Sequence, residues 1–124
     1  MPKLRDASVE AHRTTVESTM ADVAAFLQDA LGQKLVAYMA GVADAKAVGR
    51  WASGERSPRA ETERRLRDAQ YIFRLLVTKE SPYTVRAWFV GLNPQLDDES
   101  PAAAIREGRT RDAVVAAKAF LAGG

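Results

Sequence analysis

The sequence predicts an all-α protein, in which a helix-turn-helix N-terminal bundle is followed by a small helical C-terminal region. Two observations support this fold class. Alanine is abundant in the 124 residues, and residues that favour strands are sparse. Apolar residues also recur every three or four positions along most of the chain, which is the helical period. No segment has the alternation expected of a strand, so no sheet is expected.

The helices can be placed from this period and from their start and stop signals. The first contains Val9, Val16, Val23 and Leu27 and ends at Gly32. Glycine closes a helix because it accepts the left-handed conformation. The further helices are expected at residues 33–40, 44–53, 59–77, 83–90, 102–107 and 110–121, with an acidic loop at 96–100.

Two serine-proline pairs, at Ser57 and at Ser81, divide the chain. Proline cannot continue a preceding helix but is tolerated at the start of a new one. We therefore expect an N-terminal arm at residues 1–17 that is partly flexible or helical. A helix-turn-helix DNA-binding domain is expected at 18–79, and a helical partner-binding region at 80–124.

Several classes of site are not expected from the composition. The chain has no cysteine and one histidine, His12, so we expect neither a metal site nor a cofactor. No nucleophile–base pair or phosphate-binding glycine loop is recognisable, and an enzyme is not expected. No apolar run approaches the roughly 20 residues of a membrane span, and the N-terminus lacks a signal core. A cytoplasmic, nucleoid-associated protein without a membrane partner is the expectation.

The charge is unevenly distributed. The whole chain carries a formal charge of +2, yet residues 46–74 contain eight basic and four acidic residues. Such a local excess of basic residues is typical of a surface that binds phosphates. It is equally compatible with a solvated helix face held by ion pairs four residues apart. Charge by itself leaves both interpretations open.

Two short helices joined at Gly41 and followed by a sharp stop at Gly54 are typical of a helix-turn-helix. Asp44 is a suitable N-cap for the second of them, which would be the recognition helix in the major groove. Val48, Trp51 and Ala52 share one face and should be buried. The residues expected to face DNA are Ala45, Lys46, Gly49, Arg50 and Ser53. Those expected on phosphates are Lys34, Arg56 and Arg59.

Two other features have competing interpretations. Trp51 is a possible stacking residue for a single strand, but it shares a stripe with Val48, and core packing is preferred; Trp88 is likewise expected in the core. The acids Asp97 and Asp98, with Glu99, suggest a cation site, but they lack the spacing of a cation-binding loop. We interpret them as a solvated loop.

Two runs of residues resemble those of a known family. The first is Arg50 and Trp51 followed by Gly54 and Pro58. The second consists of Ala87, Trp88, Leu92, Asn93, Pro94, Leu96, Ser100, Pro101, Ile105 and Gly108. The first run resembles the Xre-like helix-turn-helix of the Xre/MbcA/ParS antitoxins, and the second resembles the C-terminal toxin-binding region of that family. The resemblance extends over roughly residues 20–121. The acidic loop and the early end of the chain depart from the family pattern.

The resemblance implies a two-part antitoxin that represses its own operon and neutralises a RES-domain toxin, an enzyme that consumes NAD. It implies a homodimer or higher oligomer, with Arg106, Arg109 and Lys118 as candidates for contact with the toxin. Two alternatives stay open. One is a stand-alone, possibly phage-encoded, helix-turn-helix regulator without a toxin. The other is a protein-binding module whose helix-turn-helix no longer binds DNA.

Overall fold

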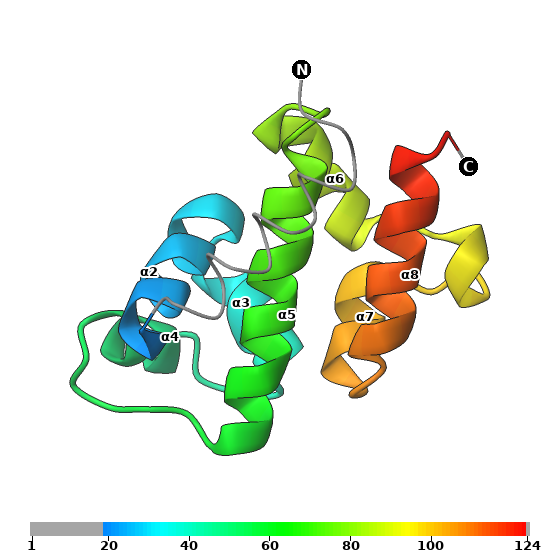
Figure 1. Cartoon of the computed structure of the whole chain (residues 1–124). Coiled ribbons are helices and arrows are strands. Elements are labelled where there is room, and N and C mark those ends of the chain that lie inside the picture. Colours follow the sequence, from blue (N-terminus) through cyan, green and yellow to red (C-terminus); the bar gives the residue numbers. More distant parts are fainter. Residues whose placement is uncertain (1–18, 124) are drawn as a thin grey trace.

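The computed structural model describes residues 19–123, and within that range the chain forms seven α-helices, one short 3₁₀ turn and no strand. The predicted all-α class is thus confirmed. The elements are α2 (Met20–Leu31), α3 (Gln33–Ala40), α4 (Lys46–Ala52), α5 (Ala60–Leu76), α6 (Pro82–Val90), η1 (Pro94–Leu96), α7 (Pro101–Arg106) and α8 (Thr110–Leu121) (Figure 1).

The first described helix begins later than the periodicity predicts. Thr19 is extended, and its hydroxyl accepts the amide hydrogen of Asp22 at 3.1 Å, so α2 begins at Met20. Threonine favours such N-caps because its side chain satisfies an amide that has no partner within the helix. The described part of the helix predicted to include Val9 and Val16 therefore starts at Met20. Its earlier part, His12 and the predicted arm at 1–17 lie outside the described residues.

The turn between α3 and α4 is set by Gly41. This residue adopts a left-handed conformation with φ of 78°, and the amide of Val42 donates to the carbonyl of Ala37. This arrangement closes α3 at the predicted residue. The next helix is shorter than predicted, since α4 begins at Lys46 and not at Asp44, and ends at Ala52. Asp44 nevertheless accepts the amide hydrogen of Lys46 from outside the helix, at 2.9 Å.

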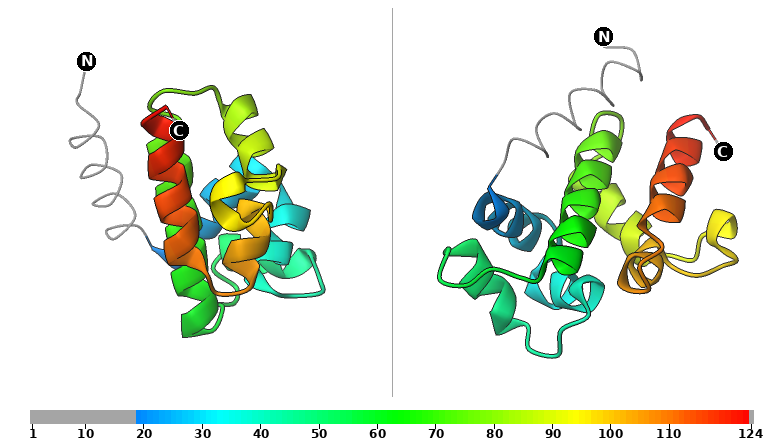
Figure 2. Two further views of the ribbon diagram at one scale, coloured as in Figure 1. Left: turned by 90° about the vertical axis from the view of Figure 1, so that its right-hand side faces the viewer. Right: turned by 60° about the horizontal axis from the view of Figure 1, so that its bottom comes forward.

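The longest helix, α5, lies at the centre of the molecule. In Figure 1 and in the right-hand view of Figure 2 it runs between α2 and α4 on one side and α7 and α8 on the other. It packs on α2, α3, α7 and α8. Its buried stripe includes Leu66, Ala69 and Phe73, as the sequence predicts. A wide loop of residues 53–59 leads into it from α4.

Two of the C-terminal helices, α6 and α7, begin with serine caps. Ser81 and Ser100 each accept an amide hydrogen three residues ahead, and the proline that follows each serine forms the first helical turn. Consequently α6 and α7 begin one residue earlier than predicted. The prolines fit because the first amides of a helix have no intrahelical partner in any case.

The core is continuous across the predicted domain boundary at residue 79. One cluster of buried side chains contains Val23 and Leu66 from the first region together with Phe89 and Ile105 from the second. Aromatic contacts follow the same path. Phe73 meets Phe26 edge-on at 5.5 Å between ring centroids and lies 6.4 Å from Phe89. The two regions therefore share a hydrophobic core.

None of the helices between residues 19 and 123 combines the length and the hydropathy that a membrane crossing requires.

Candidate nucleic-acid interface

Helix α4 is held by its apolar side, as the sequence predicts. Val48 is fully buried and Trp51 is 6% exposed, and the helix packs on both α2 and α3. Trp51 therefore offers little of its ring for stacking with a base, which agrees with the predicted core role. This packing turns the opposite side of α4 toward solvent. Lys46, Arg50 and Ser53 are exposed on that side.

Arg50 is already paired in the free protein. Its Nη1 atom lies 3.6 Å from Oδ2 of Asp44, and both side chains are about half exposed. The other carboxylate oxygen of Asp44 accepts the amide hydrogen of Lys46. Asp44 thus stabilises the first turn of α4 and also holds the guanidinium of Arg50. An exposed pair of this length is weak, so a phosphate or a base edge can displace it.

Three of the residues predicted to face outward have a more local role. The side chain of Ser53 donates to the carbonyl of Arg50 at 3.1 Å and accepts the amide hydrogen of Glu55. Gly49 is half-buried, and a methyl group on it would lie 3.0 Å from Nε2 of Gln33. Ala45 and Gly49, both expected to face outward, are only partly exposed. Gly49 lies close to Gln33 at the start of α3, and Ala45 borders a groove between α3 and α6, which sequence spacing does not reveal.

The basic residues that follow α4 gather around a groove of about 570 Å³. Arg56 and Arg59, both exposed, line it together with Arg65 from α5. Arg65 pairs with Glu61 at 2.6 Å, whereas no ion pair is recorded for Arg56 or Arg59 with any residue of the described chain. The predicted phosphate contacts Arg56 and Arg59 thus share one surface. Arg65 was not singled out from the sequence, because only the fold brings it there.

Lys34 lies in a different groove. This second groove has a volume of about 750 Å³ and runs between the start of α3 and the helix α6. Ala45 lines it as well, so two residues expected at one DNA interface border a surface that includes Tyr83 and Arg86. No local pattern in the sequence predicts this groove, since Arg86 is some fifty residues from Lys34 along the chain.

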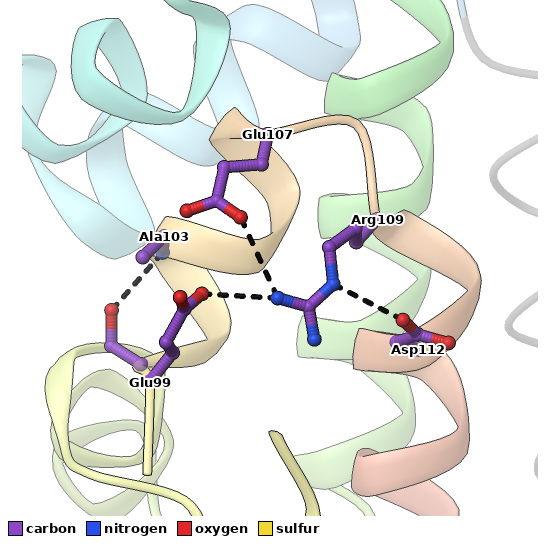
Figure 3. A network of polar contacts seen from close by, with 6 residues as sticks. Glu99, Ala103, Glu107, Arg109 and Asp112 are labelled. Carbon is purple, nitrogen blue, oxygen red and sulfur yellow. Dashed lines mark hydrogen bonds and ion pairs between the residues drawn. The ribbon is translucent and has the colours of Figure 1, made fainter. Parts of the chain in front are cut away.

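The residues expected to contact a partner are largely engaged within the chain. Arg106 donates from Nη1 to the carbonyl of Tyr38 at 2.7 Å, and its guanidinium lies 4.7 Å from the centre of the Tyr38 ring. Arg109 joins three carboxylates (Figure 3), namely Glu99 at 3.1 Å, Glu107 at 3.5 Å and Asp112 at 3.2 Å. Lys118, in contrast, is exposed near the end of α8.

These contacts change the protonation equilibrium of Arg109. The hydrogen bond to Asp112 is the largest cause that raises its pKa, and the nearby carboxylates of Glu99 and Glu107 act in the same direction. Desolvation acts in the opposite direction, but on balance the pKa of Arg109 is raised. Figure 3 shows that it joins the loop before α7 to the first turn of α8. Its position is that of a structural link between elements.

The acidic loop, predicted to be solvated, is anchored in the protein at Leu96. Leu96 is buried in a small cluster with Ala104 and Ala116, and the half-buried Trp88 packs against this cluster. Asp97 and Asp98 both adopt left-handed conformations and remain exposed. No group of three potential metal-ligating side chains occurs in the part of the chain that the structure describes.

Comparison with family models, with curated proteins and with solved structures found no match for this chain, so the interface has to be interpreted from its own residues.

Proposed function

We propose that this protein is a transcriptional repressor that binds double-stranded DNA through α3 and α4. The observation that carries the proposal is the orientation of α4. Its apolar side, with Val48 and Trp51, is buried, and its opposite side presents Lys46 and Arg50 to solvent. A short exposed helix held in this way by a preceding helix is the arrangement that places side chains in the major groove.

The chemistry of the exposed residues supports the same proposal. Arginine donates two parallel hydrogen bonds to a guanine edge, and lysine reaches guanine or a phosphate. Arg50 would read bases once DNA displaces its contact with Asp44. Arg56 and Arg59, on the loop that follows α4, would contact phosphates and fix the position of the helix in the groove.

The experiment selects a preferred duplex of about 25 base pairs from a random pool with the full chain and then compares variants on it. We expect Arg50→Ala to lose about 1–3 kcal/mol in binding the selected duplex and much less on random duplex. Arg56→Ala should weaken binding to both duplexes equally. It should also reduce the slope of log affinity against log salt concentration by about one. Arg111→Ala, on the exposed side of α8, is the matched control.

Two results would contradict the proposal. The first is that Arg50→Ala and the wild type distinguish selected from random duplex equally well, which would reject α4 as the reading helix. The second is that the wild type does not bind duplex DNA at low salt. In that case the protein-binding module would be the better description.

The repressor would be of the antitoxin type, a homodimer or higher oligomer that also neutralises a RES-domain toxin. This part of the proposal rests on the sequence resemblance. Lys118 is exposed and accessible to a partner, whereas Arg106 and Arg109 are bound to other parts of the chain. Purifying the tagged full chain from its native cell tests it. A co-purifying RES-domain protein would support the antitoxin, and its repeated absence would favour a stand-alone regulator.

A further inference from the structure

The groove between α3 and α6 has the chemistry of a protein-docking surface. Its walls are mostly apolar, with Leu35 on one side and Tyr83 and Val90 on the other. Tyr83 is 75% exposed and Val90 is 57% exposed, which are high values for side chains of this size and polarity. Exposed apolar side chains that adjoin a groove are typical of interaction sites, and tyrosine is enriched in protein interfaces.

The charged residues of this groove are both basic. Lys34 and Arg86 line it, and no acidic residue of the described chain does. Neither cation has an ion pair with any residue from 19 to 123. The groove therefore suits a segment that combines apolar and acidic side chains.

The same chain carries a segment of that kind at residues 92–99, which we call the acidic knob. Leu92 is 81% exposed, and Asp97 and Asp98 are exposed beside the 3₁₀ turn. No ion pair within residues 19–123 involves either aspartate. The knob thus offers what the groove lacks, namely unpaired negative charge next to an exposed leucine.

The knob is also held in one conformation. The side chain of Asn93 accepts the amide hydrogen of Gln95 at 2.9 Å, and its backbone accepts the amide hydrogen of Asp98 at 3.0 Å. The amide of Asn93 in turn donates to the carbonyl of Glu99, and Leu96 anchors the segment in the core. A segment ordered in advance loses little conformational freedom on docking.

Groove and knob are neighbours along the chain, since Val90 lines the groove and Leu92 begins the knob. A two-fold axis near this junction would bring the knob of the first copy to the groove of the second. It would also bring the knob of the second copy to the groove of the first. Such reciprocal contacts are the ordinary geometry of a homodimer. We infer that a second copy of this chain occupies the groove, its Leu92 against Tyr83 and Val90 and its Asp97 and Asp98 beside Lys34 and Arg86.

This inference deepens the homodimer of the proposed function and rests on that part of it, but not on DNA binding. Duplex DNA is the alternative negatively charged occupant that Lys34 and Arg86 would bind. The apolar walls and the exposed Tyr83 and Val90 favour protein, because a phosphate backbone offers them little apolar surface to bury. A second copy of the chain and duplex DNA can be told apart as occupants by measuring the molecular mass of the protein in solution and its DNA binding separately.

The test is sedimentation equilibrium of the full chain over a range of concentrations, with charge-reversal variants. We expect the wild type to dimerise and Arg86→Glu or Asp98→Arg to weaken the dimer at least tenfold. An equimolar mixture of the two variants should recover much of the lost association. Each mixed dimer contains one native contact and one reversed contact, whereas each variant alone contains two repulsive contacts.

Arg111→Glu, on the exposed side of α8, is the charge control and should leave the dimer unchanged. Asp98 has φ of 64°, a conformation that arginine adopts less readily, so a thermal melt checks that this variant folds. Leu92→Ser removes the apolar contact without a backbone constraint and should also weaken the dimer.

Three results would overturn the inference. They are a monomeric wild type at the highest concentration, a dimer that neither charge reversal weakens, and variants that do not recover on mixing. A loss of DNA binding by Arg86→Glu with an unchanged mass would assign the groove to DNA. Conversely, a dimer that responds as expected but does not bind DNA would reject only the repressor.

Discussion

The guanidinium of Arg106 lies 4.7 Å from the centre of the Tyr38 ring, and its Nη1 atom donates a 2.7 Å hydrogen bond to the Tyr38 carbonyl. Arg106 ends α7, and Tyr38 lies in the last turn of α3, so this contact joins the C-terminal region to the helix-turn-helix. It gives a second donor to the Tyr38 carbonyl, which also accepts the amide hydrogen of Gly41 at 3.1 Å.

We expect Arg106→Ala to lower the free energy of unfolding by about 1 kcal/mol, since a charge-assisted hydrogen bond and a cation–π contact are both lost at a solvent-exposed site. The matching change in Tm is roughly 3–8 °C for a chain of this size. A double-mutant cycle with Tyr38→Leu isolates the ring contact by chemical denaturation. Additive effects of the two changes would show that the ring contributes nothing.

Asp44 limits the DNA affinity that we propose for α4, because its carboxylate holds Arg50 and repels phosphates. Asp44→Asn keeps an oxygen that can accept the Lys46 amide hydrogen but removes the charge. We expect tighter binding to duplex DNA by several-fold at low salt, with a free energy of unfolding within about 0.5 kcal/mol of the wild type. Fluorescence anisotropy and a urea melt measure the two quantities. Equal or weaker DNA binding by a stable variant would show that Asp44 does not restrain Arg50.

Gly49 lies in the middle of α4 without a left-handed conformation, so its lack of a side chain serves the approach of Gln33. A methyl group there would lie 3.0 Å from Nε2 of Gln33, the mobile end of a side chain that also bonds Gln28. We expect Gly49→Ala to stabilise the chain by about 0.5–1 kcal/mol through helix propensity, because Gln33 can move aside.

A thermal melt measures this gain, and Ala47→Gly, in the same helix, should show the opposite sign. A clear destabilisation by Gly49→Ala would mean that the contact between α3 and α4 is too close to yield.

Arg109 holds three carboxylates at the junction of η1, α7 and α8. Arg109→Met keeps most of the apolar stem but leaves Glu99, Glu107 and Asp112 without their shared cation. We expect a lower Tm at low salt and a smaller loss at 1 M NaCl, where the Debye length is about 3 Å and repulsion between the acids is screened. Hydrogen exchange should locate the added mobility at residues 97–112. A loss of stability that does not depend on salt would show that Arg109 stabilises the protein through packing and not through its charge.

Much of the fold follows from local signals that the sequence contains. Gly32, Gly41 and Gly108 end helices where a left-handed residue is needed, and each has φ near 80°. Ser81 and Ser100 cap helices before their prolines. The helical period also identified the buried side of α4, because residues three and four apart must share a face. The exact starts of α2 and α4 were predicted less well. The spacing of apolar residues shows that a helix is present but does not fix its first residue to within one or two positions.

The arrangement of the candidate sites was decided by tertiary structure. Tyr38 and Arg106 are 68 positions apart, and nothing in either local sequence indicates that a helix end will meet a guanidinium. In the same way, Lys34 and Arg86 come to one groove. Arg109, which the resemblance made a candidate for contact with a toxin, pairs with three carboxylates of its own chain. Helix propensity and caps act over a few residues, so the sequence by itself determined the helices and the exposed side of α4. Contacts between distant residues depend on how those helices pack around α5, and that packing decided which charges are paired, which are free and which surfaces adjoin.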